Sequence, residues 1–159
     1  MRQLDDEKSI IDHLSEQTLY IHDIINLAFI IKKKLKKNEL DFSSLVDPSG
    51  GYQWENFSIM LPYLPKEIVE KNLDKLLEGF MDLNWPGSRV LYGYLAEVEV
   101  QKLKKSFKRV IDYAIKTDDS DWLYFIHVFM TDHKVGMEDK FSAEIEQCVI
   151  YFKSNDIDF

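Results

Sequence analysis

Apolar residues recur every three or four positions along most of this chain, which predicts a protein built from α-helices. No segment alternates apolar and polar residues between hairpin turns, so we predict no β-strands. The fold class we expect is therefore all-α. The clearest apolar stripes predict helices over five stretches, residues 66–80, 86–98, 100–116, 122–130 and 137–153.

The first third of the chain is less regular. Residues 6–37 carry one apolar stripe, which predicts either one long helix or two helices that break near Ser15 to Thr18. Residues 38–64 contain two prolines and two adjacent glycines, a density of turn formers that predicts a connection with one or two short helical turns. Within this connection, we expect Trp54 and Phe57 to pack on the core. At the other end of the chain, we expect residues 155–159 to fray.

A short corner separates two of the predicted helices. Proline fits the first position of a helix but not its interior, so Pro86 ends one helix and opens the next. We expect Asn84 to cap the new helix and Trp85 to be extended, with its indole as a wedge between the two helices. Asp82 is expected to bond backbone amides at the same corner. The segment Thr117 to Asp121 is expected to form a turn, in which acidic residues cap and charge the start of the next helix.

Two roles stay open for the corner and for the acidic turn. In the first, their side chains only cap helices and fill gaps. In the second, they form an exposed recognition surface with a tryptophan as its anchor, because tryptophan is enriched at binding hot spots. The candidate interaction surface therefore consists of six residues: Asp82, Asn84, Trp85, Asp118, Asp119 and Asp121.

Two sequence landmarks resemble a known family. The first is the run from Leu61 to Pro65, followed by a charged amphipathic helix and the corner Asp82 to Ser88; the second is the segment Asp118 to Phe125, an acidic turn followed by a helix that begins with tryptophan. Together they resemble a bacterial domain-of-unknown-function family with a D-x-N-W-P-G corner. The similarity covers residues 59–152 and leaves residues 1–50 outside.

The resemblance implies a HEAT-like α-α superhelix with no established activity. Proteins of this general sort resemble immunity or partner-binding proteins encoded beside bacterial toxins. The spacing itself suggests stacked hairpins, since the predicted helices pair over residues 66–98 and 100–131. We expect a single domain over residues 1–159, with an N-terminal helical extension and connection over 1–50 and the hairpin core over 59–152.

Charge and composition exclude several functional classes. The 159 residues carry a formal net charge of -8, which disfavours general binding to nucleic acids. The stretch Leu19 to Ile31 is interrupted by polar residues and is too short to span a bilayer, and the first residues lack the layout of a signal peptide. Cys148 is the one cysteine and falls on an apolar stripe, so we expect it to be buried and inert in a reducing, cytoplasmic compartment.

The residues with catalytic or metal-binding potential do not form a recognisable motif. The four histidines lack the spacing of two zinc ligands on one helix: His13 and His22 are nine positions apart, and His127 and His133 are six apart. The adjacent Gly50 and Gly51 have neither the spacing nor the lysine of a phosphate-binding loop. We therefore predict no catalytic residue, no metal and no cofactor, and we do not expect an enzyme.

The charge distribution is uneven, and two interpretations stay open: the charged regions are solvated faces, or they steer a partner or pair subunits. Residues 118–159 hold ten acidic residues and three lysines, whereas residues 32–37 hold five lysines. We predict a cytoplasmic protein-protein interaction module with a protein partner, in particular a basic one, and with immunity-like binding of a bacterial toxin as the narrower hypothesis. The alternatives are a small enzyme with an unrecognised site and, third, a nucleic-acid binder that would use a track of Lys102, Lys105 and Arg109. The sequence leaves the oligomeric state open.

Overall fold

The computed structural model describes residues 6–159, and all regular structure in that part of the chain is helical. This confirms the predicted all-α class. The α-helices are α1 (Glu7–Leu14), α2 (Ile21–Lys36), α3 (Tyr52–Met60), α4 (Lys66–Lys71), α5 (Leu73–Leu76), α6 (Pro86–Leu95), α7 (Val100–Lys116), α8 (Ser120–Thr131) and α9 (Ser142–Ser154). Short 3-10 helices join them: η1 (Phe42–Leu45), η2 (Leu61–Tyr63), η3 (Leu77–Met81) and η4 (Glu138–Lys140).

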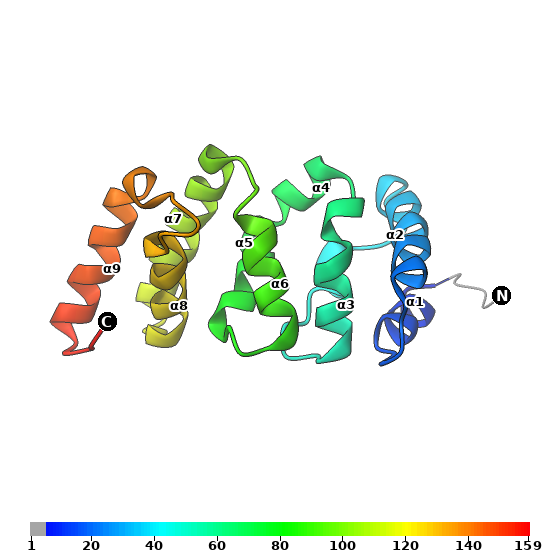
Figure 1. The fold of residues 1–159 in the computed structure, drawn as a ribbon, viewed down its shortest axis with the longest axis horizontal. Coiled ribbons are helices and arrows are strands. Elements are labelled where there is room, and N and C mark those ends of the chain that lie inside the picture. The colour runs from blue at the N-terminus through cyan, green and yellow to red at the C-terminus, as the bar shows by residue number, and fades with distance from the viewer. Residues whose placement is uncertain (1–5) are drawn as a thin grey trace.

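The helices lie in a row along the long axis of the molecule, from α1 and α2 at one end to α9 at the other (Figure 1). Contacts join neighbours along this row: α3 packs against α1, α2 and α6, while α8 packs against η3, α7 and α9. One cluster of buried apolar side chains runs from Ile10 to Phe152. The predicted single domain stays a prediction, and its first five residues, 1–5, lie outside the described part.

The apolar stripe of residues 6–37 belongs to two helices, so the second of the two alternatives is correct. Helix α1 is capped by Asp6, whose Oδ1 accepts a hydrogen bond from the Ser9 amide at 2.8 Å. Helix α2 begins after Tyr20, where the Asp23 carboxylate accepts a hydrogen bond from the Tyr20 amide at 3.1 Å. The chain turns over residues 15–20, which includes the predicted break.

The segment 38–64 is more ordered than its turn formers predicted. It contains η1 and η2, but also the nine-residue helix α3, which lies in the core. Asn56 of α3 donates hydrogen bonds to the carbonyl oxygens of Leu14 (2.7 Å) and Glu16 (3.1 Å), and so connects α3 to the end of α1. A helix that is buried on most sides has no polar face, which explains why the periodicity did not reveal it.

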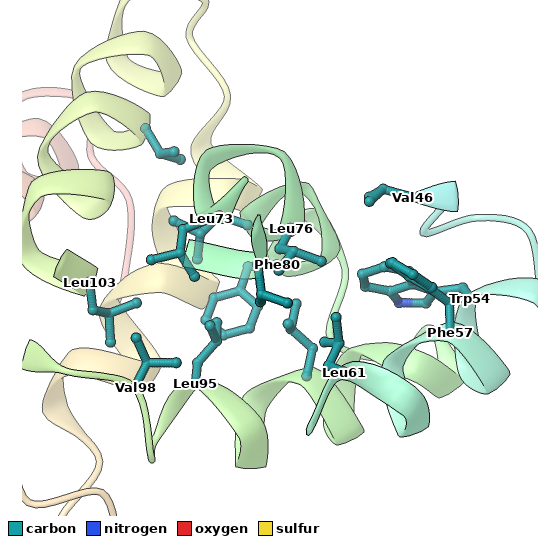
Figure 2. Close-up of a cluster of buried hydrophobic side chains, with 14 of the residues drawn as sticks. Val46, Trp54, Phe57, Leu61, Leu73, Leu76, Phe80, Leu95, Val98 and Leu103 are labelled. Carbon is teal, nitrogen blue, oxygen red and sulfur yellow. The ribbon is translucent and has the colours of Figure 1, made fainter. Parts of the chain in front are cut away.

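Trp54 and Phe57 are fully buried, as predicted, and Figure 2 shows them in the cluster that also holds Leu76 and Phe80. The indole nitrogen of Trp54 donates a hydrogen bond to the Ser88 hydroxyl at 3.1 Å, and that hydroxyl donates to the Gly79 carbonyl at 2.6 Å. A Cβ atom at Gly79 or Gly87 would lie 2.5 Å from the Trp54 ring. Trp54 therefore fills the space that the two glycines leave between α3, η3 and α6.

The helix predicted over residues 66–80 is interrupted. The Asn72 amide bonds to the Val69 carbonyl at 3.0 Å, while the Asn72 side chain donates to the Ile68 carbonyl at 2.8 Å. Because the side chain takes the carbonyl that the backbone of a continuous helix would use, α4 ends here and α5 starts again at Leu73. The last turn then tightens into η3 before the corner.

The C-terminal helices match the prediction closely, but the tail does not. Helix α7 spans the predicted residues, whereas the helix predicted over 137–153 starts later, because η4 occupies its first turn and α9 begins at Ser142 and ends at Ser154. The tail was predicted to fray, which is wrong: the Ile157 amide bonds to the Phe152 carbonyl at 2.9 Å, and the Phe159 ring lies 5.3 Å from the ring of Phe152. Aromatic packing against α9 and His127 of α8 holds this end in place.

We expect Gly87→Ala to destabilise the protein by about 2–3 kcal/mol, because the new methyl group would lie 2.7 Å from the backbone carbonyl of Trp54. Gly93→Ala is the matched control on the same helix: a Cβ at Gly93 meets nothing within 4 Å, so this change should stabilise by about 0.5–1 kcal/mol. Urea denaturation of the two variants measures both effects. Equal stabilities would show that the contact between Trp54 and Gly87 is not a tight constraint.

Candidate functional site: a pocket around Glu70

A small pocket of about 210 Å³ lies where η2, α4 and the end of α6 meet. Its walls are largely apolar, and its charged and polar groups come from α4, α6 and the residues just after α6. The lining consists of Leu61, Pro62, Leu64, Lys66, Glu70, Tyr94, Glu97 and Val98. Leucine and valine walls with a few polar groups are typical of a site that binds one side chain or a small molecule.

Two prolines shape this pocket. Pro62 lies in η2, which closes with a hydrogen bond from the Leu64 amide to the Leu61 carbonyl at 3.1 Å. Pro65 then holds the extended conformation at the start of α4, with φ of -58° and ψ of 121°. The chain therefore turns sharply before α4, and Glu70 lies in the last turns of a helix that starts beside η2. Side chains of helical residues lean toward the helix start, which directs the Glu70 carboxylate back toward this turn.

Glu70 is the most unusual residue of the pocket, because its side chain is only 7% exposed. Its Oε2 accepts a hydrogen bond from Lys102 of α7. Its Oε1 is buried and has no hydrogen-bond partner among the described residues; Lys66 Nζ lies 3.8 Å away, which is an ion pair but too long for a hydrogen bond. A buried carboxylate oxygen without a hydrogen-bond donor lowers the stability of the fold. A ligand that donates a hydrogen bond to this oxygen would remove that cost.

Tyr94 of α6 faces the same carboxylate. Burial raises the pKa of its hydroxyl, and the negative charge of Glu70 raises it further. The phenol therefore stays neutral at physiological pH. On the other side of the ion pair, the hydrogen bond to Glu70 raises the pKa of Lys102, which keeps that amine charged. The pocket thus combines apolar walls, a neutral phenol and two carboxylates, those of Glu70 and Glu97.

This chemistry fits a cationic group on an alkyl chain. A guanidinium or ammonium group could donate to Glu70 Oε1, while its methylene stem lies against Leu61, Leu64 and Val98. Lys66 and Lys102 balance part of the negative charge, so the site would bind one cation rather than several. A planar guanidinium has the further advantage that it donates several hydrogen bonds in a fixed geometry.

A second hollow, of about 500 Å³, lies between α5, η3, α7 and α8. Tyr113 and Trp122 lie in its lining, with their rings 6.3 Å apart and edge to face. Its four charged lining residues pair with one another: Arg109 donates to Asp74 at 2.7 and 3.0 Å, and Lys75 lies 2.7 Å from Glu78. Because these charges already have partners, the Glu70 pocket is the stronger candidate.

The predicted corner residues lie at the junction of η3 and α6, away from the pocket lining. Pro86 is the first residue of α6 and Trp85 is extended, as predicted. The prediction that Asn84 caps α6 is wrong: Trp85 holds the cap position and no side chain caps the helix. Asp82 accepts a hydrogen bond from the Asn84 amide at 2.8 Å. This bond forms a turn just before the cap position Trp85 and does not involve an amide of α6. The fully buried wedge at this corner is Trp54, while Trp85 is half-buried against the core.

The acidic turn connects α7 to α8, the two helices that contribute Tyr113 and Trp122 to the second hollow. Asp119 caps α8 by accepting a hydrogen bond from the Trp122 amide at 3.1 Å, as predicted. Asp118 has a φ of 56° and accepts a hydrogen bond from the Tyr151 hydroxyl. Asp121 is exposed. The six predicted residues therefore lie at two turns, three of the four acids (Asp82, Asp118 and Asp119) hold structural bonds, and their recognition role stays a prediction.

Glu70 and Tyr94 were not predicted as site residues. Glu70 is a polar position of the helix predicted over residues 66–80, and in the structure Lys102 and residues of η2 lie beside its side chain. Since Lys102 is 32 positions away in the sequence, the local pattern contained no signal for this contact with the carboxylate. The closest indication in the sequence is the proline-flanked run Leu61 to Pro65 just before α4, which is one of the two family landmarks.

The same contacts bear on the nucleic-acid alternative. Two of the three cations in the proposed track hold acidic partners, since Lys102 bonds to Glu70 and Arg109 pairs with Asp74.

Within residues 6–159, no cluster of three or more histidine, cysteine or acidic side chains is arranged to hold a metal ion. In the same part of the chain, the helices are too short or too polar to cross a membrane.

Comparison with known proteins places the chain in a family. Residues 56–158 match the family described as a domain of unknown function, DUF5071, and the chain belongs to it. The match includes every residue of the Glu70 pocket and both sequence landmarks. No curated protein and no solved structure matches the chain.

The bond between Tyr151 and Asp118 predicts a stability change at high pH. This hydrogen bond, together with burial, raises the pKa of Tyr151 from 10 to about 12. The unfolded chain therefore loses its phenol proton near pH 10 while the folded chain keeps it, so this contribution to stability is present below pH 10 and is lost by about pH 12. We expect Tyr151→Phe to be less stable than the wild type at pH 8, with the difference shrinking above pH 10. Urea denaturation of the two proteins at pH 8 and above pH 10 measures the difference in stability. A difference that stays constant with pH would contradict the role of the Tyr151 to Asp118 bond.

Proposed function

We propose that this member of the DUF5071 family is a protein-interaction module that binds a basic side chain of its partner in the Glu70 pocket. The observation that supports the proposal most is the Glu70 carboxylate, buried at 7% exposure with Oε1 lacking a donor. A partner arginine or lysine would supply that donor. Hydrogen bonds to charged groups contribute about 1.5–3 kcal/mol, enough to make one such residue a hot spot.

The charge distribution supports a basic partner. The segment from residue 118 to the C-terminus carries ten acidic residues and three lysines, which would attract a cationic surface at long range. In this proposal the acidic region, residues 118–159, speeds the association with the partner, while the Glu70 pocket provides the specific contact. The narrower form of the proposal is an immunity-like role, in which the partner is a cationic toxin domain in the cytoplasm.

The helix row supports a HEAT-like arrangement as the scaffold. Contacts join helices that are neighbours along the row, as in stacked hairpins (Figure 1). In such a stack the inner and outer faces are large surfaces without a deep cleft. A large surface that includes a small anchoring pocket is suited to binding a protein.

An enzyme is the second candidate, and it would use the same pocket. The observation that favours it is the Tyr94 hydroxyl, whose pKa is raised beside Glu70. A phenol next to a carboxylate is a possible acid and base pair. In that case Tyr94→Phe would remove turnover, whereas a binding module would retain its partner.

We expect Glu70→Gln to weaken partner binding about 10- to 100-fold without unfolding the protein, because the amide keeps the shape but loses the charge. Glu67→Gln is the matched control, since Glu67 lies on the same helix and is exposed. Both variants and the wild type serve as tagged baits in the native cell, and the captured protein is then purified and titrated by calorimetry. Circular dichroism checks the fold of each bait. A partner that binds both variants equally well would contradict the proposal.

The basic character of the partner has a separate test. An arginine in the partner's binding segment is replaced by citrulline, a neutral residue of the same shape, in a synthetic peptide. The arginine peptide should shift the NMR signals of Leu61, Tyr94 and Val98, and the citrulline peptide should bind about 10-fold more weakly or not at all. Equal binding of the two peptides would show that Glu70 does not recognise a cation.

The long-range attraction predicts a dependence on salt. Raising the ionic strength from 0.15 to 1 M shortens the screening length from about 8 to about 3 Å, so association with a basic partner should slow by about tenfold or more. The contact inside the Glu70 pocket is shielded from salt, so the dissociation rate should change little. Surface plasmon resonance at several salt concentrations separates the two rates. An association rate that does not change with salt would contradict the role of the acidic region.

A further inference from the structure

Helix α2 exposes a stripe of large apolar side chains on its outer face. Ile21 is 57% exposed, Ile25 is 38% exposed and Phe29 is 61% exposed. They are four residues apart, so they lie in one row along the helix. The adjoining face of α2 is buried in the core and carries Ile24, Leu27, Ala28, Ile31 and Leu35. Helix α2 lies at the end of the helix row, where a neighbour could reach this face (Figure 1).

The two ends of this surface carry opposite charge. Residues 6–23 hold five acidic residues and one lysine, whereas residues 32–37 hold five lysines. Figure 1 shows α1 beside the start of α2, away from the lysine-rich end of the helix. The surface is therefore acidic at one end, apolar in the middle and basic at the other end.

We infer that α2 is a dimerisation surface whose occupant is a second copy of this chain, packed antiparallel. The stripe is symmetric about Ile25: a two-fold axis there places Ile25 against Ile25 and Ile21 against Phe29 of the other copy. The same axis lays the lysine-rich end of each copy along the acidic end of the other. An interface that matches itself in this way is the requirement for a two-fold dimer.

The charge pattern is what favours a second copy over other occupants. A parallel pair would place the two lysine clusters together, and their repulsion opposes it. A partner with only acidic charge would match the lysines but would meet the acidic residues of α1. Antiparallel pairing satisfies both ends at once. It also lets the Lys33 amine, which lies 5.5 Å from the Phe29 ring centre, remain over that ring at the edge of the interface.

The first test measures mass in solution by sedimentation equilibrium over a range of concentrations. We expect a dimer for the wild type, and Ile25→Asp should weaken it about 100-fold because two carboxylates would face each other without partners. Ile150→Asp is the matched control: Ile150 is an isoleucine of α9 that is 58% exposed and lies outside α2. This control should keep the dimer. A wild type that is monomeric throughout, or an Ile25→Asp variant that dimerises normally, would overturn the inference.

The second test fixes the direction of pairing by disulfide formation. Ile25→Cys alone should form a disulfide with its own copy, whereas Ile21→Cys and Phe29→Cys should cross-link only when mixed. Cys148 is fully buried and does not compete. Disulfides within pure Ile21→Cys and within pure Phe29→Cys would indicate parallel pairing and contradict the antiparallel arrangement.

Another occupant would give a different result. If the stripe instead binds a membrane, the monomeric wild type would sediment with vesicles of anionic phospholipid and Ile25→Asp would not, which would also overturn the dimer. The inference does not depend on the Glu70 pocket. Residues 6–55 precede the family match, so Glu70→Gln should dimerise like the wild type whether or not it binds a partner.

Discussion

The fit of the Trp54 indole against the backbone of Gly79 and Gly87 is the constraint on which the middle of this fold depends. Each glycine leaves space for one edge of the ring, and the Ser88 hydroxyl satisfies both the indole and the Gly79 carbonyl. A larger residue at either glycine would force α3 away from η3 and α6. Trp54 precedes the family match by two residues, so the N-terminal helices are attached to the family domain through a residue just outside it.

This packing also positions the Glu70 pocket. With α3 and α6 held together, η2 continues from the end of α3, and the end of α6 brings Tyr94 and Glu97 to the opposite wall. Lys102 of α7 then closes the site over Glu70. Burying a carboxylate is costly, and replacing buried charge by apolar residues often stabilises proteins. A group that costs stability and faces a pocket is more readily explained by binding than by structure.

The pocket and the α2 stripe lie in different parts of the molecule and involve different interactions. The pocket offers one charged hydrogen bond in apolar walls, and the stripe offers apolar area with complementary charge at its ends. A dimer formed through α2 would carry two Glu70 pockets. A partner with two basic segments, or two copies of a partner, would then bind with higher avidity than a single pocket allows.

The sequence by itself determined the helical class, the limits of α7, the proline start of α6 and the cap of α8 by Asp119, because each depends on residues within a few positions of one another. It did not reveal α3, whose burial on most sides removes the amphipathic pattern, or the break at Asn72. Only the tertiary structure decided which tryptophan fills the corner and that Glu70 is buried. Those outcomes depend on contacts with residues about 30 positions away, and the pattern along one helix has no information about what packs on its polar face.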